Sequence, residues 1–544
     1  MRTLLVILLA TFPPALAAQS ADDLMAQGKT AYDAGDFAES GRLYAAGIEA
    51  GSRSGSDAYN AACAFALSSQ PDDAFRHLQL AADFGFSNAD LLKRDSDLES
   101  LREDTRWPEV VAHYEQRAAA QERFWNSPAM LTSYQETLSD DEKIAGLSRL
   151  WSEAKYNFAN FDLVPHLDWD SLYVATLPFV RETTSTLEYY RVLMATVAQL
   201  EDGHSNVYPP PELAMQVYAR PGLRTRLVED RVLVVEIRDP ALADRGIEIG
   251  QEVLRIDGVP VHEYASSTVR PYQSSSTEQD RDVRTYEYML LGGDAAQPIE
   301  LALQNADGTP QTVTVPRLTR AQTNALGWSR DPFVLERLPG NIAHVQLNTF
   351  GSPEAADQFE ARFDEIAQAD GLILDVRNNG GGNSGVGYRV LCALTDADSI
   401  PTSGWRTRLY RPAYRAWGQS ESTDGDPTGG WGCNDDHHFT GPVAILTSPR
   451  TFSAAEDFAV AFDLMDAGPI VGEPTGGSTG QPLFFRLPGG GSARVTSKRD
   501  SYPDGRDFVG TGVLPDIAVT PTVADVRAGE DGALTTAIGA VGGN

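Results

Sequence analysis

The spacing of apolar residues along the chain separates it into four regions. Over residues 22–117 and 130–218, apolar positions recur every three to four residues, which predicts amphipathic helices. Over 219–317, β-branched apolar residues alternate with polar ones, the pattern of a small β domain. Over 330–530, short apolar strands alternate with amphipathic helices, which is typical of α/β layers. The predicted fold class is therefore multidomain α+β, with helices first, a β domain in the middle and an α/β core last.

The first helical region contains an internal repeat. The segment from Gly28 to Phe37 predicts a helical hairpin with a Gly-Asp turn, and the segment from Asn60 to Leu67 repeats this theme about 34 residues later. The period resembles the tetratricopeptide repeat, and this resemblance implies a protein partner for residues 22–117. A generic helical cap also fits, and the sequence leaves both interpretations open.

The β region carries a motif of its own. Gly246 and Gly250 precede a predicted strand that ends in the turn Asp257-Gly258, and this order resembles the later half of a PDZ domain. The resemblance implies recognition of an extended peptide or a chain end. An ordinary small β domain without a ligand fits the same pattern.

The beginning of the chain has the pattern of an export signal. Arg2 supplies a positive start, Leu4 to Ala10 form an unbroken apolar run, and small residues from Ala15 to Ala17 flank a cleavable bond. The run is too short to span a bilayer, and no later stretch has eighteen consecutive apolar residues. We therefore expect residues 1–18 to be a cleaved signal peptide and the mature chain to be periplasmic or secreted, without a transmembrane anchor.

The charge balance narrows the range of partners. The chain has 44 basic and 76 acidic residues, and its formal net charge is −32. Such a surface repels phosphate backbones, so we expect no nucleic-acid partner. No long basic run is present that would attract an anionic membrane.

Cysteine and histidine usage gives little sign of metal chemistry. The three cysteines, Cys63, Cys392 and Cys433, match no zinc spacing. In an oxidising compartment Cys392 and Cys433 could pair, and three unpaired thiols are an equal alternative. The run from Asp435 to His438 has ligand residue types, but adjacent histidines on an extended loop point apart. We expect no metal and no cofactor.

Two predicted strand ends carry unusual loops. Gly380, Gly381 and Gly382 follow the buried strand that ends near Asp375, and such a loop can turn backbone N–H groups toward an anion or oxyanion. A nucleotide-binding loop would also need a Lys-Ser/Thr ending, which is absent.

The second loop places Ser453 between a predicted strand and a helix, where N–H groups stabilise developing negative charge. With Glu456 three residues later it also has the form of a capping box. From this loop alone, a nucleophile and a helix cap are equal interpretations. His204 ends an Asp-Gly-His run on a turn after an amphipathic helix, and it needs partners before a functional interpretation is favoured.

The order of the motifs is more specific than any one of them. Asp-Gly-His at 202–204 is followed by the PDZ-like region, by Asp-x-Arg-x-Asn-x-Gly-Gly from Asp375, by Thr-x-Ser-Ala-Ala-Glu from Thr451, and by Gly-x-Gly-Val-x-Pro-Asp from Gly510. This set resembles the tail-specific, or C-terminal processing, peptidases and the tricorn core protease over roughly residues 130–525. The resemblance implies a ClpP/crotonase-like catalytic core that hydrolyses a polypeptide substrate.

The resemblance also implies roles for individual residues. Ser453 falls on the nucleophile, and His204 falls on the base of the tricorn-like branch. The backbone N–H groups of Gly381 and Ala454 fall on the oxyanion donors, with Gly380 and Gly382 beside them at the substrate.

Two departures from the family pattern bear on the base. Ser478 stands where Ser-Lys members carry lysine, so a Ser-Lys dyad is not expected. Val509 stands where tricorn-like members carry a glutamate, which leaves Asp507 as the expected orienter of the histidine and Asp504 as its alternative. The sequence thus predicts an exported serine peptidase. The alternative is a non-catalytic ligand- or protein-binding module on the same fold, as in the related retinoid carriers of the eye.

Overall fold

The computed structural model divides the chain into two compact units, residues 1–129 and residues 130–544. The predicted signal peptide lies outside the described residues. None of the helices in the described part has both the length and the apolar character needed to cross a membrane. The residues that the structure describes are 20–327, 330–420, 422–433 and 437–542.

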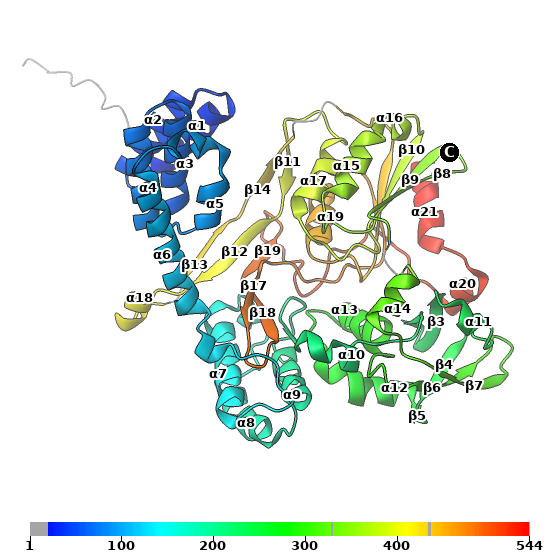
Figure 1. Ribbon diagram of the computed structural model, residues 1–544. Coiled ribbons are helices and arrows are strands. Elements are labelled where there is room, and N and C mark those ends of the chain that lie inside the picture. Colours follow the sequence, from blue (N-terminus) through cyan, green and yellow to red (C-terminus); the bar gives the residue numbers. More distant parts are fainter. Residues whose placement is uncertain (1–19, 328–329, 421, 434–436, 543–544) are drawn as a thin grey trace, which may run out of the picture. The chain divides into compact units, whose positions relative to one another are not determined.

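The N-terminal unit is helical, as expected (Figure 1). Its α-helices are α1 (Ala21–Asp33), α2 (Phe37–Glu49), α3 (Gly55–Leu67), α4 (Pro71–Asp83), α5 (Ala89–Arg94) and α6 (Trp107–Trp125). α3 begins 34 residues after α1, and α4 begins 34 residues after α2. Small residues allow close packing, since a Cβ atom on Gly41 would lie 2.9 Å from the ring of Phe65. The helix pairs therefore recur with the expected period, and their tetratricopeptide assignment stays a prediction.

The α/β core is built on a six-stranded sheet (Figure 1). Its strands, in order across the sheet, are β20 (Ile517–Ala518), β16 (Ile470–Gly472), β15 (Val443–Thr447), β10 (Gly371–Asp375), β9 (Ile342–Leu347) and β8 (Phe333–Leu338). All neighbours are parallel except β8 and β9. Every residue of β10 and β15 is buried, which accounts for their continuous apolar sequences.

Helices bury both faces of this sheet. One hydrophobic cluster joins the strands to α15 (Glu354–Ala361), α17 (Ser384–Cys392) and α19 (Ala454–Leu464). A second cluster joins the opposite face to α21 (Gly532–Val541). Because β10 and β15 are parallel neighbours, the loops after them leave the sheet at the same edge. The triple-glycine loop and the Ser453 turn are therefore adjacent.

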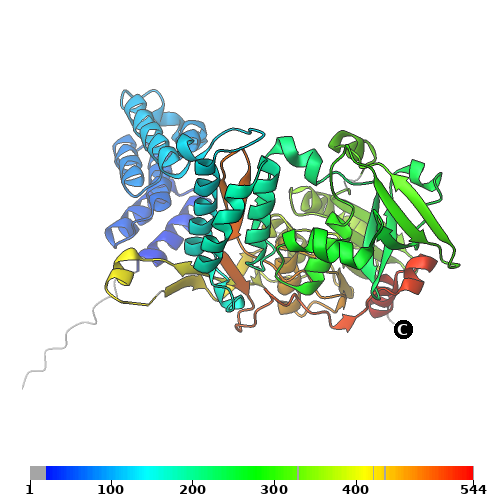
Figure 2. The same cartoon turned by 90° about the horizontal axis from the view of Figure 1, so that it is seen from below.

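The helical region 130–218, which we call the cap, is completed by strands that the local pattern did not predict. The helices α7 (Asp140–Asn157), α8 (Trp169–Glu182) and α9 (Thr186–Ala198) share a hydrophobic cluster with a three-stranded sheet (Figure 2). Its order is β1-β18-β17, with bounds β1 (Asn206–Tyr208), β18 (Ser492–Thr496) and β17 (Pro482–Arg486). Two strands from the end of the core domain thus complete the cap that carries His204.

The middle region forms the expected β domain, interrupted by helical turns. Its sheet order is β2-β3-β4-β6-β7, with bounds β2 (Leu223–Val228), β3 (Arg231–Ile237), β4 (Glu252–Ile256), β6 (Ile299–Gln304) and β7 (Pro310–Val315). Between β4 and β6 lie α12 (Val261–Tyr264), α13 (Glu278–Asp282) and short helical turns. The assignment of this domain as PDZ stays a prediction.

The segment between α17 and β15 contains strands and is joined to α17 by a disulfide. Its elements are β11 (Ser399–Thr402), β12 (Gly404–Leu409), α18 (Pro412–Ala416), β13 (Ser422–Asp426) and β14 (Gly429–Gly432). A bridge joins Cys392 to Cys433, with their Cα atoms 5.4 Å apart, and Cys63 is buried and unbridged. Of the two alternatives for the thiols, the structure shows the paired one.

Candidate active site

His204 lies on the turn between α9 and β1, where a buried carboxylate fixes the backbone. Asp202 accepts hydrogen bonds on Oδ1 from the N–H of His204 at 3.0 Å and from the hydroxyls of Ser205 at 2.9 Å and Thr496 at 2.5 Å. Asp202 is itself only 1% exposed. Since three donors meet one buried oxygen, the turn that carries the imidazole has a single well-defined conformation.

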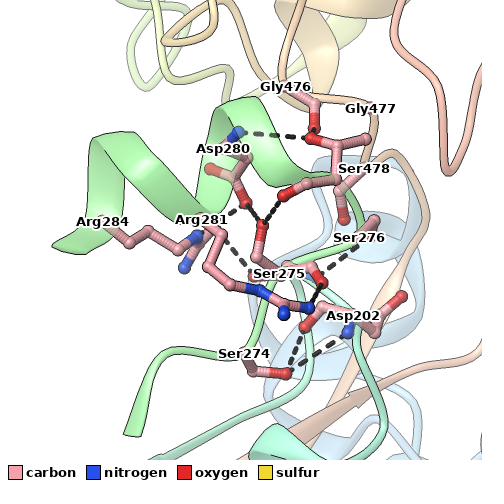
Figure 3. Close-up of polar contacts among 12 residues, drawn as sticks. Asp202, Ser274, Ser275, Ser276, Asp280, Arg281, Arg284, Gly476, Gly477 and Ser478 are labelled. Carbon is pink, nitrogen blue, oxygen red and sulfur yellow. Dashed lines mark hydrogen bonds and ion pairs between the residues drawn. The ribbon is translucent and has the colours of Figure 1, made fainter. Parts of the chain in front are cut away.

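The β domain holds the histidine loop from the other side (Figure 3). The hydroxyl of Ser274 donates to the carbonyl of Asp202 at 2.7 Å, and the hydroxyl of Ser276 accepts the N–H of Gly203 at 3.1 Å. Arg284 donates from Nη2 to the carbonyl of Gly203, also at 3.1 Å. The loop is therefore positioned by the cap and by the β domain together.

Ser453 stands on the sharp turn between β15 and α19. Its φ of 57° and ψ of −127° are unusual for a residue with a side chain, and such strain costs about 1–3 kcal/mol. The turn is held because Ser453 N–H donates to Glu456 at 3.1 Å and Phe452 N–H donates to the carbonyl of Asn379 at 3.0 Å. The Ser453 hydroxyl then lies 3.0 Å from Nε2 of His204. The Ser453 hydroxyl and the imidazole of His204 thus form a serine–histidine pair at the start of a capped helix, and the role of Ser453 as nucleophile stays a prediction.

The surroundings of His204 favour its neutral form. The imidazole is buried and stacks on the ring of Phe452, with centroids 4.7 Å apart. Burial lowers the pKa of His204 well below its ordinary value, and the positive charges of Arg494, Arg284 and Lys498 lower it further. A neutral imidazole is the form that can accept a proton from a hydroxyl.

Gly381 allows the glycine loop to contact the Ser453 turn, because it has no side chain. Its φ is +92°, and a Cβ atom there would lie 2.6 Å from the carbonyl oxygen of Phe452 and 2.7 Å from Cβ of Ser453. Its own N–H donates to Oδ1 of Asn379 at 2.9 Å. The Gly381 N–H, which was expected to be an oxyanion donor, is therefore hydrogen-bonded to a neighbouring side chain. Gly381 is instead the residue at which the glycine loop comes closest to the Ser453 turn.

Ala454, the other expected oxyanion donor, lines a cavity of about 510 Å³ that contains Ser453 and His204, together with the two glycines expected at the substrate. Gly380, Gly382 and Ala454 are all on its wall. Among the described residues, no hydrogen-bond acceptor is recorded for these three N–H groups. Backbone N–H groups at the wall of a cavity are the kind of donors that can stabilise an oxyanion.

Ser478 occupies the far side of the imidazole. Its hydroxyl lies 3.0 Å from Nδ1 of His204, opposite the nitrogen that contacts Ser453. The sequence identified Ser478 only as a replacement for lysine, because nothing in its local motif shows that the loop folds back onto His204. The pair of contacts gives the order Ser478–His204–Ser453.

Glu456 holds the Ser478 loop and the Ser453 turn together. This buried carboxylate accepts five hydrogen bonds, and burial raises its pKa to about 7 despite these donors. The donors are Thr475 Oγ1 at 2.6 Å, Gly477 N at 2.6 Å, Ser478 N at 2.9 Å, Thr479 Oγ1 at 3.2 Å and Ser453 N at 3.1 Å. The capping-box spacing in the sequence was the one available signal for this role.

The structure does not bring Asp507 to the histidine. Its carboxylate faces Arg406 at 3.6 Å and Arg499 at 3.8 Å, and no hydrogen bond or ion pair between described residues joins it to His204. Asp504 bonds Arg506 at 2.8 Å. Asp504 and Asp507 therefore pair with nearby arginines. The residue that contacts Nδ1 of His204, where an acidic orienter was expected, is Ser478.

Residues of metal-ligand types lie in two places along the chain. Asp435 and Asp436 lie outside the described residues, and the ring of His437 is tilted against that of Phe363, with centroids 4.5 Å apart and an interplanar angle of 33°. In the N-terminal unit, Cys63, Asp95 and Asp97 are close enough to share an ion. The Cys63 thiol instead donates to Asp95 at 3.7 Å, and burial raises its pKa.

Known proteins resemble this chain in sequence. The family model described as Peptidase family S41 matches residues 341–519. The chloroplastic C-terminal processing peptidase of Tetradesmus obliquus is 28% identical over 247 residues, which cover 43% of this chain and 48% of that protein. A putative tricorn protease homolog 2 of Streptomyces coelicolor (strain ATCC BAA-471 / A3(2) / M145) is 24% identical over 397 residues, 68% of this chain and 30% of that protein. The chain spans about half or less of the length of these relatives.

A solved structure resembles this chain in fold. Mature CPAF complexed with lactacystin aligns with a TM-score of 0.55 and 16% sequence identity, covering 72% of this chain and 95% of that chain. At such identity the likeness shows a shared architecture of helices and sheets. The matched family region, 341–519, contains the glycine loop, Ser453 and Ser478, whereas His204 lies before it.

Proposed function

Since residues 341–519 of this chain form a peptidase family S41 domain, we propose that the protein is an exported serine peptidase that cleaves polypeptides with Ser453 as nucleophile and His204 as base. The observation that carries this proposal is the 3.0 Å contact between the Ser453 hydroxyl and Nε2 of His204, in a cavity with unused backbone N–H groups. The two residues come from loops 249 positions apart. Their contact is the geometry that nucleophilic catalysis requires.

The first half of the reaction forms an acyl-enzyme. Ser453 Oγ attacks the scissile carbonyl carbon while its proton passes to Nε2 of His204. The carbonyl oxygen becomes an oxyanion, which accepts hydrogen bonds from Ala454 N–H and from Gly380 or Gly382 N–H. His204 then returns the proton to the leaving nitrogen, and the C–N bond breaks. In the second half, water attacks the ester carbon with the same proton transfers and releases the new carboxyl end and free Ser453.

In this mechanism Ser478, rather than Asp507, orients the imidazole. A proton on Nδ1 of His204 and a hydrogen bond from it to Ser478 Oγ leave Nε2 free to accept the Ser453 proton. Ser478 is held in turn through its N–H by Glu456. The orienter is neutral, so the imidazolium that forms during the reaction gains less stabilisation than a carboxylate would give.

The decisive experiment compares the wild-type protein with Ser453→Ala. A fluorophosphonate probe should label the wild type covalently and leave the variant unlabelled, and hydrolysis of casein peptides should fall by about 10⁴-fold or more. Chelators should have no effect. A matched control is Ser448→Ala, which removes a hydroxyl on the same turn that donates to the carbonyl of Arg377 and accepts the N–H of Arg450. Binding of peptides by the wild type without labelling or turnover would support a non-catalytic binding module instead.

Export and the two flanking modules complete the proposal. Cleavage after Ala17 or Ala18 would release the mature chain into the periplasm or the medium, and N-terminal sequencing of secreted protein would test this.

The repeated helix pairs would contact a protein partner, and the β domain would receive an extended part of the substrate. Deletion of residues 22–117 should leave peptide hydrolysis intact if the helices serve only to bind a partner, because they form a separate compact unit.

A further inference from the structure

The cavity that contains Ser453 and His204 is lined by four basic side chains, and three of them are neutralised by the protein itself. These ion pairs are Arg284–Asp280 at 2.7 Å, Arg450–Glu287 at 3.2 Å and Lys498–Asp500 at 2.6 Å. The fourth basic side chain is Arg494, which forms no ion pair with any residue that the structure describes. The negative charge of Asp202 attracts it without forming an ion pair, so the guanidinium can still pair with a group that enters the cavity.

Neutral groups hold Arg494 in a fixed orientation. Asn206 accepts hydrogen bonds on Oδ1 from Nε of Arg494 at 3.1 Å and from Nη2 at 2.9 Å. The guanidinium also lies 5.7 Å from the ring centroid of Tyr208 and 5.8 Å from that of Phe484. The amide and the two rings orient the guanidinium without cancelling its charge.

The register of the cap sheet explains this arrangement. Arg494 lies on the central strand β18, directly opposite Asn206 on β1 and Phe484 on β17. The neighbours of Arg494 along β18, Ala493 and Val495, belong to the hydrophobic cluster of the cap. Successive residues of a strand face opposite sides, so one face of this sheet packs on the helices and the other presents the guanidinium to the cavity.

We propose that Arg494 binds a carboxylate of the peptide substrate close to the bond that is cleaved. This inference rests on the proposed peptidase function, and it adds which chemical group of the substrate the cavity recognises. A guanidinium matches a carboxylate with two parallel hydrogen bonds, and a partly buried site strengthens them. Phe484, which is 61% exposed, supplies an apolar surface beside the charge for the chain that carries the carboxylate.

A peptide offers such a carboxylate in two places, at its C-terminus or on an Asp or Glu side chain. The test uses internally quenched peptides in matched pairs that differ in this group alone. One pair carries a free C-terminus or a C-terminal amide within three residues of the cleaved bond. The other pairs carry Glu or Gln at each of these positions, with the C-terminus amidated. The pair that shows a difference identifies the source of the carboxylate.

The variants compared are wild type, Arg494→Gln, Arg494→Lys and a matched control, Arg486→Gln. Arg486 lies on the same sheet, on β17, but does not line the cavity. For one pair we expect wild-type kcat/KM to favour the carboxylate by about 10- to 100-fold, the usual contribution of hydrogen bonds to a charged group. Arg494→Gln should reduce this ratio to about 1, Arg494→Lys should retain part of it, and Arg486→Gln should leave it unchanged.

Peptide affinities separate this inference from the proposed function. In a Ser453→Ala background, the Kd of each pair is measured by fluorescence anisotropy, with and without Arg494→Gln, and thermal unfolding confirms that each variant folds. A carboxylate preference in Kd that disappears with Arg494→Gln supports the site even if no peptide is hydrolysed. Equal kcat/KM and Kd within every pair in the wild type, or a preference that survives Arg494→Gln, would overturn it. Absence of Ser453 labelling in the wild type would count against the peptidase function alone.

Discussion

The hydroxyl of Ser478 lies 3.0 Å from Nδ1 of His204, on the side of the imidazole opposite Ser453. The two residues are separated by 274 positions in the sequence. In the proposed mechanism this contact gives the orienting role to a neutral hydroxyl instead of a carboxylate, and the closely packed Gly203 allows the contact. A Cβ atom on Gly203 would lie 2.9 Å from the Ser478 hydroxyl and 2.9 Å from the ring of Phe452.

The ionisation of His204 should appear at a lower pH than that of an ordinary histidine. Its pKa lies well below 6.5 because the ring is buried beside Arg494, Arg284 and Lys498. The base is active when neutral, so kcat/KM should rise with pH through a limb below 6.5 and be constant above it. The limb lies lower than the unperturbed range of roughly 6–7 that a solvated histidine would give. A pH series of kcat/KM measures it, and His204→Ala should lose the limb and most of the activity. Full activity in that variant would place the base elsewhere.

Ser478→Ala should impair the reaction more than it impairs substrate binding. Loss of the hydroxyl leaves Nδ1 of His204 buried without a partner, so we expect kcat to fall by about 10- to 100-fold with little change in KM. The comparison variant is Asp507→Asn, whose carboxylate faces Arg406 and Arg499 and not the imidazole. It should keep kcat within about threefold, since its ion pairs with these arginines are long, at 3.6 and 3.8 Å, and neither arginine touches the imidazole. A larger loss of kcat for Asp507→Asn than for Ser478→Ala would mean that Asp507 orients the histidine after all.

Glu456 should make folding stability depend on pH. Burial raises its pKa from 4.5 to about 7, so the folded chain binds this proton more tightly than the unfolded chain. Its contribution to stability is therefore full below about pH 4.5 and decreases as pH rises to about 7, by up to about 3 kcal/mol. Glu456→Gln does not ionise and should lack this component. Urea unfolding of both proteins between pH 4 and 8 tests the difference, and parallel pH curves would contradict it. At every pH the variant should also lose activity, because its amide NH₂ faces N–H donors.

Gly381→Ala and Gly380→Ala should behave very differently although they are neighbours. At Gly381 the new Cβ would press on Phe452 and Ser453 and would require a φ of +92°, so the nucleophile turn must move. We expect a destabilisation of about 2–4 kcal/mol and a loss of probe labelling at Ser453 of 100-fold or more. A Cβ on Gly380 meets nothing within 4 Å, and alanine keeps the N–H, so this variant should label at nearly the wild-type rate. Thermal unfolding and labelling rates measure both, and equal effects would mean that the close approach at Gly381 is unimportant.

Local pattern determined a large part of this architecture. The 34-residue helix repeat, the β domain, and the alternation of strand and helix in the core follow from apolar spacing, which reflects the periods of the helix and the strand. The loops at Ser453 and at the three glycines were also identifiable, because a strand–turn–helix with a serine and a run of glycines are visible in short stretches of sequence.

Other relationships were decided only by the tertiary structure. Contacts between segments far apart in the chain position three polar residues, Ser478, Glu456 and Arg494. The 475–479 loop, which Glu456 holds, folds onto His204. Strand β18, which carries Arg494, joins the cap sheet beside β1. The expected orienter, Asp507, was chosen from a spacing, but a spacing cannot show which arginine a carboxylate will face. Hydrophobic periodicity records which side of an element is buried. It does not record which distant polar groups meet there, because those contacts depend on strand order and register across the whole domain.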